Sequence, residues 1–192
     1  MALIVISGHA QSGKNTLGDI MKAKFKENYF TMAYANDLKR KLQKDFDLSW
    51  EQLHGELKEV PDTRYVKNVV DGKVTHWTPR EIMQFMGTDV YRAIDDDFWI
   101  KQLFKYIDRN YLENVIITDG RFPSEIAAVT SRGGIHIRVE RVHDKKVHGK
   151  THVSETALDD SDTADFVVNN NGTKEDLAIV AEKIIKEIEN GR

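Results

Sequence analysis

The sequence contains no cysteine among its 192 residues. A disulfide framework, a thiolate zinc site and a cysteine nucleophile are therefore excluded, and the composition fits a reducing, cytoplasmic location. No stretch approaches the roughly 18 apolar residues that a membrane helix needs, so we expect no membrane partner. The apolar stretch 2–6 is too short for a signal peptide, and no basic segment precedes it.

An excess of positive charge is also missing. The chain has 28 basic and 31 acidic residues and a net charge of −3, whereas duplex-binding proteins usually gather extra Lys and Arg on one face. We therefore expect no nucleic-acid partner. The length suits one domain with an inserted lid, and the apolar (40%) and charged (31%) fractions are those of an ordinary globular protein.

Patterns typical of buried strands alternate with helical patterns along the chain. Strands are predicted over the short apolar runs 2–7, 29–35, 114–119, 135–140 and 164–169. Helices are predicted over 14–28, 36–46, 49–60, 78–87, 96–110, 124–134 and 173–190, with Asn36, Ser49, Thr78 and Thr173 as N-caps. Asp-Gly between β-branched residues predicts a hairpin at 69–74.

This alternation predicts an α/β fold, with a mainly parallel five-stranded sheet covered by helices on both faces, in three layers. Ligands of such sheets bind beyond the carboxyl ends of the strands. Ser7, Asp119 and Arg121 fall at or just after such ends. Asp37 follows the second strand a little further on, so we expect the site to be built from these positions.

The segment at the end of the first strand reads SGHAQSGKNT, residues 7–16. Gly8, four further residues, Gly13 and Lys14 have the spacing of a phosphate-binding loop, in which backbone N–H groups surround a phosphate and the lysine reaches the terminal phosphates. The alternative is a glycine-rich turn without function, but the flanking strand and helix favour a nucleotide site. The expected ATP contacts are Gly8, Ala10, Gln11, Ser12, Gly13, Lys14, Asn15 and Thr16.

The position after Lys14 departs from the general pattern of such loops. Ser or Thr normally stands there and offers magnesium a hydroxyl oxygen, but this chain has Asn15 and places Thr16 one residue late. The side-chain carbonyl of Asn15 is also a hard, neutral ligand. One helical step turns Thr16 about 100° away from the phosphates. We predict that Asn15 faces Mg²⁺, directly or through water. Asp119 is predicted to contact the ion only indirectly, through the water molecules bound to it.

Further segments, taken in order with this loop, resemble the bacteriophage deoxynucleoside monophosphate kinase family. They are YANDLK (34–39), REIMQFMGTDVYR (80–92) followed by Phe98 and Trp99, IITDGRFPSE (116–125), IRVER (137–141), HVSE (152–155) and NNNGTKEDL (169–177). Their order and spacing carry the resemblance more than any single segment does.

The resemblance implies a P-loop NTPase fold and transfer of the ATP γ-phosphoryl group to a deoxynucleoside 5′-monophosphate, with Mg²⁺ as the cofactor. It also implies a single kinase domain over 1–192, with an acceptor-binding helical region at about 36–110 and a mobile lid at about 141–162. Whether the protein is a homodimer stays open.

The resemblance assigns acceptor binding to the helical region. Arg80 and Gln84 lie four residues apart on one helical face, where an arginine can hold a phosphate bidentately and a glutamine amide can read a base edge. The alternative is an exposed polar face with ordinary surface pairing, and a helix-face role explains Asp37 equally well. The expected substrate-binding residues are Asp37, Lys39, Arg80, Gln84, Thr88, Arg92 and Trp99.

The expected catalytic residues are Lys14, Asp119, Arg121 and Arg141. Asp119 ends a strand, where P-loop enzymes place the acid that orders magnesium through its waters. The alternative is a turn in which Asp119 caps a helix and Arg121 pairs with Glu125. Arg141, at the entry to the lid, is favoured over Arg138 for closing on the ATP phosphates.

Two polar groups lie near the end of the chain. His143, His148 and His152 fit no metal-ligand spacing and are interpreted as solvated loop residues. Asn170 and Gly172 follow the last strand, where related kinases pack adenine against the backbone, so they are added to the expected ATP contacts. Turn chemistry and helix capping explain the same two residues without a ligand.

Two other functions stay open on the sequence alone. A kinase for another phosphorylated small molecule, of the phosphomevalonate or dephospho-coenzyme A type, would share the loop and the layout. A non-catalytic ATP-binding regulatory module would share only the loop, and the acceptor-like segment around Gln84 argues against it.

Overall fold

The computed structural model describes residues 2–141, 153, 157–158 and 164–191. The predicted lid lies almost entirely outside the described residues, and so do His143, His148 and His152. The chain forms two compact units, one of Met1–Tyr34 with Ile100–Arg192 and one of Ala35–Trp99. Among the helices described, none combines the length and the apolar character that crossing a membrane requires.

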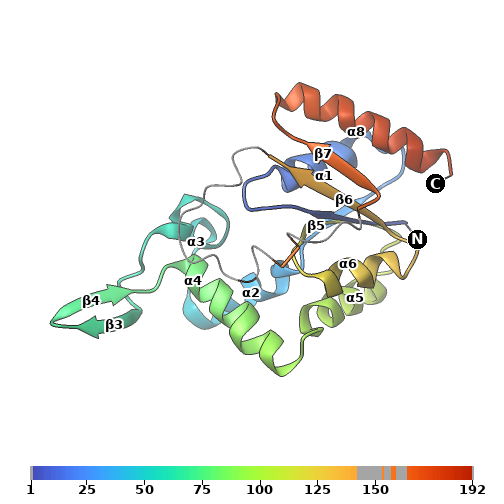
Figure 1. Ribbon diagram of the computed structural model, residues 1–192. Helices are drawn as coiled ribbons and strands as arrows, with labels where there is room; N and C mark the ends of the chain where they lie inside the picture. The colour runs from blue at the N-terminus through green and yellow to red at the C-terminus, as the bar shows by residue number, and fades with distance from the viewer. Residues whose placement is uncertain (1, 142–152, 154–156, 159–163, 192) are drawn as a thin grey trace. The chain divides into compact units, whose positions relative to one another are not determined.

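The first unit is built on one five-stranded sheet (Figure 1). In sheet order its strands are β2 (Phe30–Met32), β5 (Asn114–Gly120), β1 (Ala2–Ser7), β6 (Ile135–Glu140) and β7 (Phe166–Asn169). Every neighbouring pair is parallel. The predicted α/β fold with a five-stranded parallel sheet is therefore confirmed, although β2 is shorter than the predicted 29–35.

Helices cover both faces of this sheet. α1 (Lys14–Lys24) and α8 (Lys174–Glu189) lie on one face, and α5 (Phe98–Arg109) and α6 (Pro123–Thr130) lie on the other (Figure 1). The core under α1 and α8 includes Ile4, Ile6, Leu17, Met21, Ile116, Ile137, Leu177, Ala181 and Ile184. Each such large apolar side chain contributes about 1.5–3 kcal/mol by leaving water, so this core fixes the strand ends beside which the loop lies.

Side-chain caps begin three of the predicted helices. Ser49, Thr78 and Thr173 each accept a hydrogen bond from the backbone N–H three residues later, which confirms them as N-caps. The fourth predicted cap is wrong, because α2 already begins at Ala35 and Asn36 lies inside its first turn.

The second unit is mainly helical and carries a two-stranded hairpin. Its elements are α2 (Ala35–Phe46), α3 (Trp50–His54), η1 (Glu56–Glu59), β3 (Val66–Val70), β4 (Lys73–His76), α4 (Pro79–Gln84) and η2 (Phe85–Arg92). Asp71 and Gly72 both have positive φ (48° and 74°), as a tight hairpin turn requires, so the hairpin is confirmed.

Two helices of this unit differ from the prediction. The helix expected over 49–60 is interrupted at Gly55, which separates α3 from the 3₁₀ turn η1. The helix expected to end at Gly87 continues to Arg92, but as the π-helix η2. π-helical turns are rare and often occur at functional sites.

A buried polar network lies at the base of the hairpin. Arg64 Nη2 lies 2.7 Å from Asp62 Oδ2, Arg64 Nε donates to Asp62 Oδ1 at 2.9 Å, and Gln52 Nε2 donates to Asp62 Oδ2 at 2.8 Å. The hydrogen bond from the Arg64 guanidinium holds the pKa of Asp62 below its usual range. Tyr65 adds a hydrogen bond from its hydroxyl to the Phe46 carbonyl at 2.5 Å. The network therefore fixes the hairpin to α2 and α3.

Candidate active site

The segment Gly8–Gly13 connects the central strand β1 to the start of α1. Gly8 (φ 138°) and Gly13 (φ 102°) both adopt backbone conformations that favour glycine. Both also make close backbone contacts, since a Cβ at Gly8 would meet the Val139 carbonyl oxygen of β6 and a Cβ at Gly13 would meet the Asn170 amide. The two glycines of the predicted motif are therefore required by the shape of the loop.

Lys14 closes this loop. Its Nζ donates to the Gly8 carbonyl at 2.8 Å and to the His9 carbonyl at 2.5 Å, and the residue is only 8% exposed. The ammonium thus lies across the loop beside the α1 N-terminus, and both features favour an anion there.

Ser12 provides an observation that fits a phosphate ligand. The residue is fully buried, and its Oγ has no hydrogen-bond partner among the residues that the structure describes. An unsatisfied buried hydroxyl costs about 1–3 kcal/mol. The Ser12 hydroxyl is therefore a hydrogen-bond donor that suits a ligand rich in acceptor oxygens, such as a phosphate group.

The residues predicted to bind magnesium come from two elements. Asn15, exposed, and Thr16, half-buried, both lie in the first turn of α1. Asp119 lies near the carboxyl end of β5, where its Oδ1 accepts a hydrogen bond from the Tyr34 backbone N–H at 2.7 Å. Within the described ranges, no group of three or more His, Asp and Glu residues could hold a metal by itself. A magnesium ion bound with a nucleotide usually takes most of its ligands from phosphate and water, so it does not need three protein ligands.

The turn after Asp119 is held by two residues to which the sequence reasoning gave no such role. Glu125, which is buried, accepts hydrogen bonds at Oε2 from the backbone N–H groups of Arg121 (2.8 Å) and Phe122 (3.2 Å). The Tyr34 hydroxyl donates to the Glu125 carbonyl at 3.0 Å. Burial raises the pKa of Tyr34, with Glu125 and Asp119 adding to the shift, so its hydroxyl stays a donor. The Glu three residues after Phe122 was the sequence signal for this cap.

A second pair that the sequence reasoning missed lies where β1 meets the loop. Ser7 Oγ is 2.7 Å from His136 Nε2, and both residues are 1% exposed. The His136 backbone N–H donates to Asp165 Oδ2 at 2.9 Å. A histidine inside the apolar strand pattern 135–140 was the only hint of this contact in the sequence.

The predicted residues after β6 and β7 lie in different surroundings. Asn170 Nδ2 donates to the Ser12 carbonyl at 2.7 Å, so this residue contacts the loop. Gly172 lies against Asp176, next to the Thr173 cap of α8. Arg138 lies within β6 and pairs with Glu140, whereas Arg141 follows β6 and is exposed.

Four of the expected acceptor residues lie along one helical run of the second unit. Arg80 and Gln84 belong to α4, and Thr88 and Arg92 belong to η2. Arg80 pairs with Glu59, and the buried Arg92 pairs with Asp96 at 2.7 Å. Trp99 is 5% exposed and donates from Nε1 to the Gly87 carbonyl at 2.8 Å, so its indole supports η2.

Asp37 and Lys39 make contacts of the kind expected for a helix face. Asp37 lies 3.1 Å from Arg40 and 3.7 Å from Lys41, both on its own helix. Lys39 Nζ lies 3.4 Å from His54 Nδ1, and the pKa of His54 is lowered by burial and by the charges of Lys39 and Lys58. These contacts suit the helix-face alternative without testing substrate binding.

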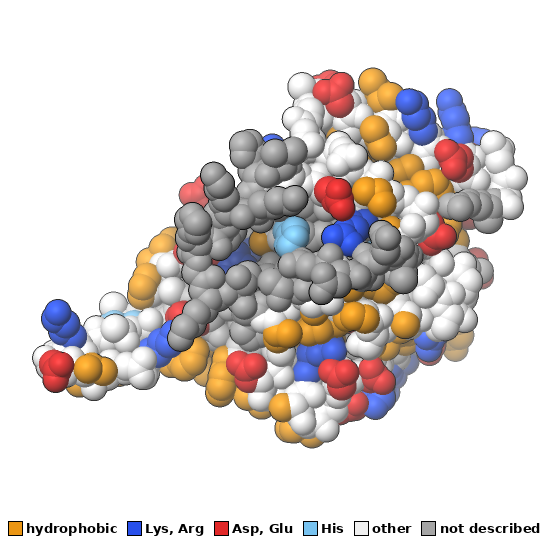
Figure 2. Space-filling model, viewed as in Figure 1, with side chains coloured by type: hydrophobic (Ala, Val, Ile, Leu, Met, Phe, Trp, Pro, Cys, Tyr) orange, Lys and Arg blue, Asp and Glu red, His pale blue; other side chains and the backbone are white. Residues whose placement is uncertain are grey.

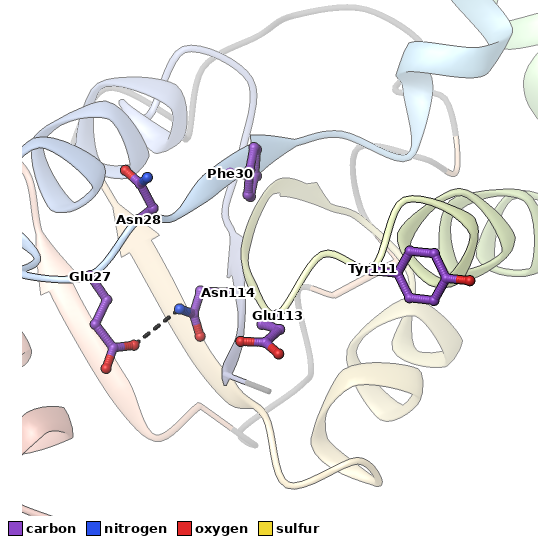
Figure 3. Close-up of a pocket in the computed structure, with 6 residues that line it drawn as sticks. All are labelled: Glu27, Asn28, Phe30, Tyr111, Glu113 and Asn114. Atoms are coloured by element: carbon purple, nitrogen blue, oxygen red, sulfur yellow. Dashed lines mark hydrogen bonds between the residues drawn. The ribbon is translucent and has the colours of Figure 1, made fainter.

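A separate surface hollow of about 430 Å³ lies at the opposite end of the sheet (Figure 3). Phe30 and Asn114, which line it, are the first residues of β2 and β5. Asn114 Nδ2 donates to Glu27 Oε2 at 3.0 Å, so these two side chains are paired with each other, and the Tyr111 ring points away from them (Figure 3). On the face drawn in Figure 2, acidic and basic side chains are interspersed. Neither feature suggests a second ligand site.

A parallel sheet whose central strand leads through a glycine loop and a buried lysine into a helix is the arrangement of P-loop nucleotide-binding proteins. The chain belongs to the deoxynucleotide monophosphate kinase family, whose model matches residues 52–181. That match includes Asp119 and the expected acceptor residues from Arg80 to Trp99. It does not include Asp37, Lys39 or the loop, whose assignment depends on its own geometry.

Individual relatives agree with this family. The chain is 30% identical over 191 residues to a putative deoxynucleotide monophosphate kinase of Acanthamoeba polyphaga mimivirus, covering 92% of each chain. It is 29% identical over 116 residues to the deoxynucleotide monophosphate kinase of Enterobacteria phage T4, covering 58% of this chain and 47% of that one. Shikimate kinase from Aquifex aeolicus shares the fold, with a TM-score of 0.52, 15% identity and 99% of each chain covered. The protein is thus a nucleotide kinase by family and fold.

Proposed function

We propose that the protein transfers the γ-phosphoryl group of ATP to the 5′-phosphate of a deoxynucleoside monophosphate, giving the diphosphate and ADP. The observation that carries the proposal is the Lys14 ammonium, held across the loop at the carboxyl end of the central strand. Family membership supports the acceptor class.

Phosphoryl transfer depends mainly on positioning and on neutralising spread negative charge. In this proposal the N–H groups of the loop and the α1 N-terminus bind the ATP phosphates, and Lys14 exchanges its loop carbonyls for phosphate oxygens. Mg²⁺ supplies further charge neutralisation, and Asn15 and Asp119 are the residues that would hold it. No general base is required, because the acceptor phosphate is already nucleophilic at neutral pH.

The acceptor is assigned to the second unit. Arg80 would bind the acceptor phosphate after leaving Glu59, and Gln84 would read the base edge. Arg92 is buried beside Asp96, so it serves better as a fixed charge than as a residue that swings toward the ligand.

The test is an ADP-release screen over deoxy- and ribonucleoside monophosphates, with phosphomevalonate and dephospho-coenzyme A as comparison acceptors. We expect ADP to form at a steady rate only when a deoxynucleoside monophosphate is added. Hydrolysis that is independent of any acceptor, or transfer to one of the comparison acceptors alone, would overturn the proposal. The Lys22→Ala variant is a matched control, since Lys22 lies in the last turn of α1, away from the loop.

A further inference from the structure

The phosphate loop is held by a residue that follows it by more than 150 positions. Asn170 lies just after β7, and its Nδ2 donates to the Ser12 carbonyl at 2.7 Å. The Asn170 backbone is itself anchored, because its N–H donates to the Glu140 carbonyl at the end of β6 at 2.7 Å. The amide is therefore fixed relative to the sheet from which the loop begins.

This contact determines the direction of one N–H group. The peptide unit between Ser12 and Gly13 is planar and trans, so its C=O and N–H point in opposite directions. When Asn170 holds the Ser12 carbonyl, the Gly13 N–H must point away from Asn170. Without that hydrogen bond, the peptide unit could turn about the bonds that flank it, and glycine at φ 102° would restrain it little.

The glycine and the amide also fit each other in space. A Cβ on Gly13 would occupy the place of the Asn170 amide nitrogen. The Gly13 position therefore has two requirements, a positive φ and room for Asn170. The second of these cannot be found from the spacing of the motif.

We infer that Asn170 is a positioning residue, which directs the Gly13 N–H toward the nucleotide phosphates and does not read the adenine base. The inference rests on the proposed function, since it assumes that the loop binds phosphate. One N–H of the Asn170 side-chain amide donates to the Ser12 carbonyl, and this bond holds the side chain at the loop.

Binding of two ligands can distinguish a role in positioning the loop from a contact with the adenine base. ATP carries a base and inorganic tripolyphosphate does not, so titration calorimetry with both tells a phosphate effect from a base effect. The variants are Asn170→Ala and Asn170→Leu, both of which lack the N–H₂ donor and add no charge beside the phosphates; the second also keeps a similar size. Asn169→Ala is the matched control, because Asn169 is the exposed neighbour at the end of β7.

We expect both Asn170 variants to weaken ATP and tripolyphosphate by the same factor, roughly tenfold, with Asn169→Ala unchanged and the acceptor KM unaltered. In ¹⁵N-glycine spectra, the Gly13 amide should shift on adding tripolyphosphate to the wild type and shift less in Asn170→Leu. That reading needs no activity, and circular dichroism confirms the fold of each variant.

Two results would overturn the inference while leaving the proposed function intact. One is weaker ATP binding with unchanged tripolyphosphate binding, which would make Asn170 a base contact. The other is unchanged binding of both ligands. If the wild-type protein bound neither ligand, the proposed function itself would fail, and the positioning role would fail with it.

Discussion

The phosphate loop and the helical run 79–92 position their functional groups by different means. In the loop, main-chain groups and one lysine are held by glycine geometry, by hydrogen bonds within the loop and by Asn170. In the helical run, the expected functional groups are long side chains, and Arg80 and Arg92 each have an acidic partner. Under the proposed function, the donor site would therefore be preorganised, whereas acceptor binding at Arg80 would require an ion pair to be exchanged.

The largest effect on activity is expected from a substitution in the phosphate loop. Lys14→Ala removes the one charge that spans the loop, and kcat should fall by roughly 10²-fold or more, as for the loss of a fixed charge-stabilising donor. The thermal midpoint should fall modestly as well, because Lys14 is buried and bonds two loop carbonyls. Near-normal kcat in this variant, measured beside Lys22→Ala, would contradict the phosphate-loop assignment.

We expect a substitution in the polar network around Asp62 to lower the stability of the protein without affecting ATP binding. Asp62→Asn removes the charge that Arg64 and Gln52 hold, and the free energy of unfolding should fall by about 1–3 kcal/mol. The KM for ATP should stay constant. A raised KM for ATP with unchanged stability would be the opposite result.

The same network predicts a pH dependence. Because the folded-state pKa of Asp62 is lowered, its contribution is fully present above the unfolded-state pKa and is lost as pH falls through the folded-state value. Below about pH 4, the wild type should therefore lose more stability than Asp62→Asn, which lacks the group. Urea titrations of both proteins from pH 7 to pH 3 measure the difference.

We expect substitutions of the acceptor residues to have two kinds of effect, depending on whether the residue contacts the base or the phosphate of the acceptor. Gln84→Ala should change the ranking of bases, while Arg80→Ala should weaken all acceptors alike, by roughly tenfold in KM. Arg92→Ala should also weaken all acceptors and should lower stability, because it removes a buried side chain and leaves its space unfilled. Effects confined to the KM for ATP would mean that the two sites are reversed.

The magnesium residues should give smaller changes. Asn15→Ala should raise the magnesium requirement and lower kcat several-fold, and Asn15→Thr should restore part of both, since it returns a hydroxyl oxygen to the position after Lys14. Thr16→Val keeps the shape and should be nearly silent. Activity against Mg²⁺ concentration is the measurement, and a strong defect in Thr16→Val beside a mild one in Asn15→Ala would reverse the assignment.

The sheet could be predicted because its strands are continuous apolar runs between clear helices, and the loop because its glycines have a fixed spacing. The hairpin followed from Asp71 and Gly72, whose turn geometry is local. In each case the sequence signal is carried by a few neighbouring residues. The sequence pattern therefore contained most of the information that fixes these elements.

What could not be predicted depends on contacts between distant residues or on small energy differences. Asn170 with Ser12 and Ser7 with His136 each join residues more than 100 positions apart. η2 replaces an α-helix where the Trp99 indole takes the Gly87 carbonyl, a contact that helical periodicity does not report. The misplaced cap at Asn36 reflects a two-residue difference in where α2 begins, which is within the ordinary variation of helix ends.

The smallest expected effect tests the ion-pair exchange directly. Glu59 is largely exposed and pairs with Arg80, so Glu59→Gln should release the guanidinium at little cost to stability. An exposed ion pair contributes up to about 1 kcal/mol, so the acceptor KM should fall by no more than about fivefold, with the KM for ATP unchanged. Lys67 and Glu81 form a second pair at 2.6 Å in the same unit, and Lys67→Met serves as the control that breaks a pair without freeing Arg80. An acceptor KM that rises in Glu59→Gln would show that Glu59 orients Arg80 for the ligand rather than competing with it, and the donor and acceptor sites would then both be preorganised.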